Sequence, residues 1–130
     1  MTAPSPTAAA SPGPAPSLSG TVELRTGEGW LAVCPAGALL PGRGVAALLP
    51  DGRQAALFRD RAGRLYAIGN VDPFTGAGVL CHGLLGSVQS RAYVASPLLK
   101  QRFDLADGHC LDDDTVAVES YPIRVAPATP

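Results

Sequence analysis

Short apolar runs that end at turn residues recur along this chain, and they limit what it can fold into. The run at residues 30–34 ends at Pro35, and the run at 44–49 ends at Pro50-Asp51-Gly52. Proline fixes its own φ and glycine accepts a positive φ, so Pro-Asp-Gly predicts a tight turn. Runs this short between such turns favour β-strands over helices.

Three of these runs follow one another with only a turn between them. Residues 44–49, 54–59 and 64–68 predict a three-stranded antiparallel meander. One brief helical turn is expected at the sequence PAGALLPG, residues 35–42. Many short strands at regular spacing predict an all-β fold, a small antiparallel β-sandwich or barrel. The remaining strands of this fold are expected at residues 30–34, 92–95, 101–105, 115–120 and 121–125.

The beginning of the chain differs from the rest in composition. Residues 1–19 contain no charged side chain and consist mostly of Ala, Pro, Ser and Thr. Such a segment cannot bury enough apolar surface to offset the entropy lost on ordering. The sequence therefore predicts a disordered Pro/Ala/Ser-rich tail over residues 1–21 and one domain over residues 22–130.

The charge balance and the cysteines exclude several classes of protein. The net charge is −1 and no basic stripe is present, so a nucleic-acid partner is not expected. The longest uncharged stretch of the domain, residues 73–90, is interrupted by Pro, Gly and polar residues, so no membrane span is expected. The three cysteines are odd in number and widely spaced, which favours a cytoplasmic protein with reduced thiols.

Two Cys-His pairs are the first candidates for a metal site. Cys81-His82 and His109-Cys110 are ligand types, but adjacent residues of a strand point to opposite faces and chelate poorly. The simpler interpretation has each cysteine buried and each histidine exposed. A site assembled across both segments stays an alternative. The three aspartates at 112–114 lack the spacing of a calcium loop and predict a solvated turn.

The sequence SPLLKQRFDLADG, residues 96–108, resembles the second cluster-binding loop of Rieske domains. In that loop Cys-Pro-x-His precedes a Phe-Asp-Leu strand that ends in a glycine turn. In the first Rieske loop Cys-x-His follows a strand of the Leu-Tyr-Ala-Ile type, and here Asp72-Pro73-Phe74 follows such a strand. The resemblance implies that the four ligand positions are Asp72, Phe74, Ser96 and Leu99.

These four residues do not suit an iron–sulfur cluster. A Rieske cluster needs two thiolates on one iron and two imidazoles on the other. Phe74 and Leu99 have no ligating atom, so a conventional [2Fe–2S] centre cannot form on them. We expect their side chains to pack against each other or against a shared core beneath the two loops, as an apolar plug.

A closer resemblance covers residues 30–125. The sequences AIGNVDPFTGAGVL (67–80), VASPLLKQRFDLADGHCLDD (94–113) and YPIRV (121–125) resemble the small subunit of assimilatory NAD(P)H-dependent nitrite reductase, a Rieske-like β fold without a cluster. One departure is Cys81-His82, where this family is expected to have Ser-Arg.

This resemblance implies a cytoplasmic partner, a large subunit that carries FAD, a [4Fe–4S] cluster and siroheme. That subunit takes electrons from NAD(P)H and reduces nitrite to ammonium in nitrate assimilation. The chain itself is expected to hold no catalytic residue, no cofactor and no metal. Its role would be to support the large subunit.

The two loops of the empty ligand positions form the expected contact face, residues 72–75 and 96–102. The candidate partner-binding residues on it are Pro73, Thr75, Lys100 and Arg102. Two other functions stay open. One is an electron-transfer protein whose non-standard iron–sulfur cluster uses the three cysteines, Cys34, Cys81 and Cys110. The other is a Rieske-like adaptor of another oxidoreductase.

Overall fold

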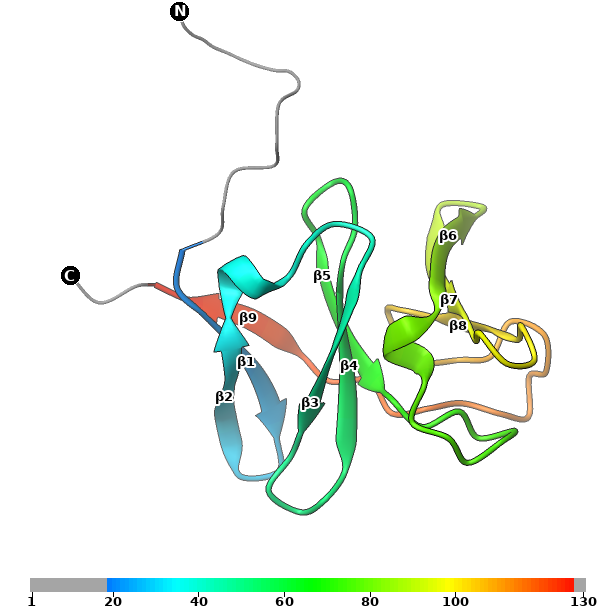
Figure 1. Cartoon of the computed structure of the whole chain (residues 1–130), viewed down its shortest axis with the longest axis horizontal. Helices are drawn as coiled ribbons and strands as arrows, with labels where there is room; N and C mark the ends of the chain where they lie inside the picture. Colours follow the sequence, from blue (N-terminus) through cyan, green and yellow to red (C-terminus); the bar gives the residue numbers. More distant parts are fainter. Residues whose placement is uncertain (1–18, 128–130) are drawn as a thin grey trace, which may run out of the picture.

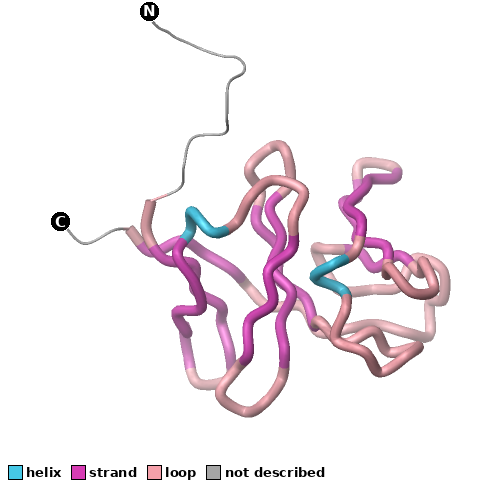
Figure 2. The backbone as a smooth tube through the Cα atoms, viewed as in Figure 1, coloured by secondary structure: helices cyan, strands magenta, loops and turns pink. Residues whose placement is uncertain are grey.

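The computed structural model describes residues 19–127, and strands dominate it (Figures 1 and 2). Nine strands and two 3₁₀ helices of three residues each occur in this part of the chain. No helix among residues 19–127 is long and apolar enough to cross a membrane. The strands are β1 (Thr21–Thr26), β2 (Gly29–Pro35), β3 (Gly44–Leu48), β4 (Gln54–Arg59), β5 (Leu65–Gly69), β6 (Leu84–Val88), β7 (Arg91–Ala95), β8 (Arg102–Asp104) and β9 (Ile123–Ala126).

The strands form three antiparallel sheets of three strands each. Their orders are β2-β1-β9, β3-β4-β5 and β6-β7-β8. The predicted meander is the middle sheet, in which β4 pairs with β3 on one side and β5 on the other. The predicted all-β fold is confirmed, and the predicted helical turn is the 3₁₀ helix η1 (Ala36–Ala38).

Three details of the strand prediction are wrong. Strands β1 and β6 were not identified, and residues 115–120 do not form a strand. The bonds of this segment go to separate neighbours: Val118 donates to the Gly108 carbonyl, and the Glu119 carbonyl accepts from the Gly69 amide. Without one continuous partner it makes isolated bridges rather than a ladder.

The domain begins slightly earlier than expected. Strand β1 starts at Thr21, which the sequence analysis assigned to the tail. Residues 1–18 of the predicted tail lie outside the described residues.

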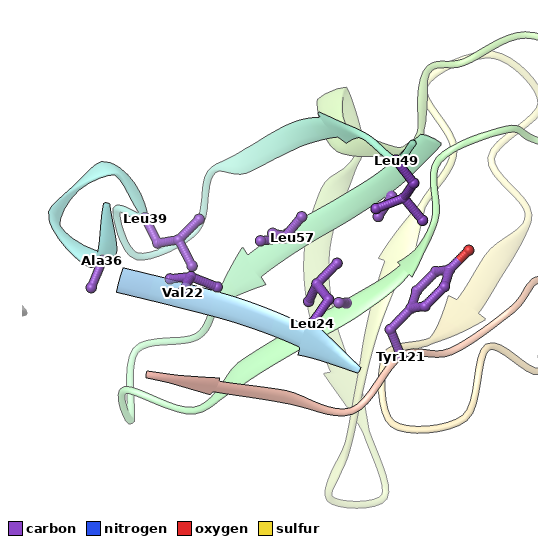
Figure 3. Packing of buried hydrophobic residues seen from close by; sticks show 9 residues of the cluster. Val22, Leu24, Ala36, Leu39, Leu49, Leu57 and Tyr121 are labelled. Atoms are coloured by element: carbon purple, nitrogen blue, oxygen red, sulfur yellow. The ribbon is translucent and has the colours of Figure 1, made fainter. Parts of the chain in front are cut away.

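The first core lies between the sheet of β1, β2 and β9 and one face of the middle sheet (Figure 3). Leu24 of β1 and Leu57 of β4 meet in it with no exposed surface, and Tyr121 closes one end. Its buried members are Val22, Leu24, Ala36, Leu39, Leu49, Ala55, Leu57, Ala67 and Tyr121.

The second core lies on the other face of the middle sheet and extends to the sheet of β6, β7 and β8. Phe58 of β4 and Phe103 of β8 are its largest fully buried side chains. Its buried members are Ala56, Phe58, Ile68, Leu80, Cys81, Val94, Phe103, Leu105 and Cys110. Strand β4 alternates between the two cores, so five of its six residues are buried.

Candidate functional site

The first ligand-position loop follows β5 and is organised by Asp72. This carboxyl group has no exposed surface. Its Oδ1 accepts a hydrogen bond from the Phe74 amide at 2.8 Å, and its backbone carbonyl accepts bonds from the amides of Thr75 and Gly76. An aspartate that bonds the amide two residues ahead is typical of a tight turn. Asp72 therefore shapes the loop that carries it.

The second loop joins β7 to β8 and is organised in the same way by Ser96, which is also buried. The Ser96 amide donates to the Gln101 carbonyl at 2.9 Å, and the Ser96 carbonyl accepts from the Lys100 amide at 3.1 Å. The Ser96 hydroxyl oxygen accepts a bond from the Leu98 amide at 3.3 Å. These three bonds close the loop on itself.

The two organising residues are joined to each other. The Ser96 hydroxyl donates to Asp72 Oδ2 at 2.6 Å. The structure therefore brings together the two residues that the sequence places at the thiolate positions. A buried hydrogen bond connects the loops where a Rieske domain would connect them through iron.

A third polar residue, Asn70, was missed by the sequence analysis. It is 1% exposed, and its Oδ1 accepts from the Cys81 amide at 2.8 Å while its Nδ2 donates to Gln54 Oε1 at 2.9 Å. Asn70 thereby ties the 3₁₀ helix η2 (Leu80–His82) to β4. The available signal was an asparagine directly after a strand that ends in glycine, a pattern typical of a structured turn.

The remaining two ligand positions behave differently from each other. The Phe74 side chain is half-buried against the second core, with its ring centroid 6.3 Å from that of Phe103. Leu99 is 54% exposed, so the expectation that it packs beneath the loops is wrong. Of the two expected apolar residues, Phe74 alone packs inward.

The four candidate partner-binding residues do not share one environment. Pro73, Thr75 and Lys100 are exposed. Arg102 is held by Asp112, with Nη2 at 2.8 Å from Oδ1, and its guanidinium lies over the Tyr93 ring at 5.6 Å. The hydrogen-bonded guanidinium lowers the pKa of the Asp112 carboxyl.

Comparison with known proteins identifies the family. Residues 29–129 match the family of the Rieske-like [2Fe-2S] domain. The nitrite reductase (NADH) small subunit of Salmonella typhimurium is 45% identical over 97 residues, which are 74% of this chain and 89% of that protein. The chain belongs to the Rieske-like nitrite reductase small subunit family.

Two further matches are a solved structure and a longer protein that contains a similar domain. A crystal structure described as an NADH-dependent nitrite reductase small subunit from Mycobacterium tuberculosis is 57% identical, with a TM-score of 0.67. The match covers 69% of this chain and 80% of that one. A nitrite reductase [NAD(P)H] large subunit of Klebsiella oxytoca is 41% identical over 96 residues, which are 74% of this chain but 10% of that protein.

The ligand set that gives the Rieske-like family its description does not fit here. Of the four positions, Asp72 and Ser96 are bonded to each other, and Phe74 and Leu99 offer no donor atom. Among residues 19–127 no three His, Cys, Asp or Glu side chains lie close enough to hold a metal ion. No step of the chemistry is therefore assigned to a cluster in this chain.

The cysteines of this family member are separated by the two cores. Cys34 packs against the first core, whereas Cys81 and Cys110 are buried in the second. Burial raises the pKa of the Cys34 and Cys81 thiols. The site that the alternative electron-transfer function requires is not formed. Cys81 is buried and His82 is exposed, as expected, but both residues lie on a 3₁₀ helix and not on a strand. In the second pair Cys110 is buried as expected, whereas His109 is half-buried and not exposed.

Proposed function

We propose that this chain is the small subunit of an NAD(P)H-dependent nitrite reductase and that it carries no cofactor of its own. The large subunit, expected to hold FAD, siroheme and a [4Fe–4S] cluster, takes electrons from NAD(P)H and reduces nitrite to ammonium. The expected location of the complex is the cytoplasm. This chain contributes to the reaction by binding and supporting the large subunit.

The observation that carries the proposal is the Asp72–Ser96 hydrogen bond. It keeps both ligand loops in a Rieske-like fold although the ligands are absent. Electron transfer does not explain why a domain without a cluster retains these loops. Binding to a partner protein does explain it.

The relatives support the same partner. The match inside the Klebsiella oxytoca large-subunit chain has 41% identity, close to the 45% of the separate Salmonella typhimurium small subunit. In the Klebsiella protein this domain is covalently part of the large chain. A domain found both as a separate subunit and inside the large chain is expected to work against that chain in either arrangement.

The geometry suits a rigid contact. Asp72 and Ser96 join the two loops through a buried hydrogen bond, and Asn70 holds the start of the first loop between η2 and β4, so little loop entropy remains to be lost on binding. Phe74 anchors the first loop to the second core. These residues position the loops and take no part in a proton or electron step.

The test is genetic and biochemical. A strain of the native host that lacks this gene should lose most NAD(P)H-dependent nitrite reduction in extracts, and the wild-type gene should restore it. The tagged chain should co-purify with a siroheme-containing protein. Unchanged nitrite reduction without the chain would contradict the proposed function. Stoichiometric iron in the separately purified chain, with absorption bands in the visible range, would contradict its cofactor-free role.

A further inference from the structure

The two loops joined by the Asp72–Ser96 bond carry an unusual share of the exposed apolar surface. Seven large apolar side chains are exposed among residues 19–127, and three of them are in these loops. Val71 is 40% exposed, Leu98 50% and Leu99 54%. Exposed prolines at 73 and 97 extend this surface. Exposed apolar side chains on two hydrogen-bonded loops are candidates for a surface that another protein covers.

Only one unpaired charge belongs to the same loops. The Asp72 carboxylate is buried and hydrogen-bonded, and Arg102, at the end of the second loop, is paired with Asp112. Lys100 is exposed, and no described carboxylate lies within ion-pair distance of it. We call the six residues Val71, Pro73, Pro97, Leu98, Leu99 and Lys100 the loop patch. Its net character is apolar with one positive charge.

The backbone at Lys100 gives a second, independent observation. Its φ is 68°, a conformation that favours glycine. The other two non-glycine residues with positive φ, Gln89 and Ser90, form the two-residue turn between β6 and β7, where such angles are normal. Lys100 instead ends the turn of residues 97–99, where its amide donates to the Ser96 carbonyl at 3.1 Å. Glycine is favoured at such a position, so the turn itself does not account for a lysine there.

We propose that the loop patch is the docking surface for the large subunit, and that Lys100 pairs there with a carboxylate of an otherwise apolar surface on that subunit. This inference rests on the proposed function. Burial of the leucines and prolines would supply most of the association energy, and the charge pair would fix the orientation. Arg102 shapes the second loop through Asp112 instead of meeting the partner.

The test measures the affinity of the chain for purified large subunit by calorimetry. Lys100→Glu should weaken binding at least about tenfold at low salt, and less at high salt, because the charges are exposed. Leu98→Ser with Leu99→Ser should weaken it by a similar factor at any salt concentration. The matched controls are Arg43→Glu, an exposed arginine in the loop before β3, and Leu48→Ser with Leu84→Ser, two leucines that are 74% and 78% exposed. Both controls should bind within about twofold of wild type.

A glycine variant separates docking from folding. Lys100→Gly removes the side chain and relieves the positive φ, so the melting temperature should stay equal or rise while the affinity falls. Lys100 is also the only lysine in the chain, so an amine-reactive reagent modifies this one side chain apart from the N-terminus. Its modification should slow when the large subunit is bound.

The outcomes distinguish this inference from the proposed function. If wild type does not bind the large subunit, the proposed function is wrong and the docking surface with it. If wild type binds and the loop-patch variants bind equally well, only the docking surface is wrong. Unchanged modification of Lys100 in the complex would also overturn it.

Discussion

At the scale of single residues, a buried hydrogen bond joins the two loops that the resemblance to Rieske domains identifies as ligand loops. Asp72 and Ser96, which the sequence analysis expects at the thiolate positions, meet at 2.6 Å with almost no exposed surface. A buried carboxylate is stable only when hydrogen bonds compensate for its lost hydration, and here the Ser96 hydroxyl and the Phe74 amide do so. The connection between the loops therefore needs no ion.

Removing both partners of this pair should cost less than the sum of the two single removals. Ser96→Ala leaves the Asp72 carboxylate without one donor, so the free energy of unfolding should fall by about 1.5–3 kcal/mol. The double variant Asp72→Ala with Ser96→Ala should lose less than the sum of the single losses. Denaturant melts measure all three, with Ser87→Ala as an exposed hydroxyl control expected to lose less than about 0.5 kcal/mol. Additive losses would mean that the bond contributes nothing.

Phe103 in the second core and Phe74 packed against that core offer a graded comparison. Phe103 has no exposed surface, so Phe103→Ala should lower the free energy of unfolding by about 3–5 kcal/mol. Phe74 is only half-buried, so Phe74→Ala should cost about 2 kcal/mol. Denaturant melts of both variants check the order. A loss below about 0.5 kcal/mol for Phe74→Ala, the range of ordinary surface substitutions, would show that the ring does not anchor its loop.

At the scale of elements, the segment from β8 to β9 holds the sheets together although it forms no strand between them. Leu111 donates to the Arg102 carbonyl, the Gly69 amide donates to Glu119, and Tyr121 donates to the Ala67 carbonyl. The first of these bonds reaches β8, in the sheet of β6, β7 and β8, and the other two reach β5 of the middle sheet. Tyr121 then enters the first core immediately before β9.

The position of Tyr121 gives the domain an alkaline limit. Burial, and next the negative charge of Glu119, raise the pKa of Tyr121 to about 12. An unfolded tyrosine titrates near 10. Between these values the unfolded chain releases the proton and the folded chain keeps it, so stability is complete below pH 10 and falls as the pH rises from about 10 to 12. Denaturant melts should show this fall in wild type and a smaller one in Tyr121→Phe. Parallel profiles of the two proteins in this range would contradict it.

At the scale of the whole molecule, β4 makes the two cores one cooperative unit. Leu57 faces the first core and Phe58 the second, both without exposed surface. Gly44 of β3 lies so close to η2 that a Cβ there would collide with the Cys81 carbonyl, which packs the two halves directly together. Neither core can be lost without disturbing the strand that serves the other.

Two probes in different halves should therefore report one unfolding transition. Trp30, the only tryptophan, lies in β2, and its fluorescence reports the first sheet. The thiols of Cys81 and Cys110 report the second core, in a Cys34→Ser background that removes the third thiol. We expect the same denaturant midpoint from fluorescence and from thiol labelling. Separated midpoints would show that the halves unfold independently.

Local sequence determined much of this protein. The Pro-Asp-Gly turn at 50–52 and the short apolar runs around it gave the meander, because turn geometry and strand length depend on neighbouring residues alone. The resemblance to the two Rieske loops implied four ligand positions, Asp72, Phe74, Ser96 and Leu99, because each motif lies within one loop.

Only the tertiary structure decided how those positions are used. The Asp72–Ser96 bond spans 24 residues, and the Asn70 bond to Cys81 spans 11, so no local pattern contains both partners. The burial of the apolar residue in each loop was decided there too: Phe74 packs near Phe103 of the second core, and Leu99 stays 54% exposed. Burial depends on contacts with residues far along the chain, which no local pattern contains.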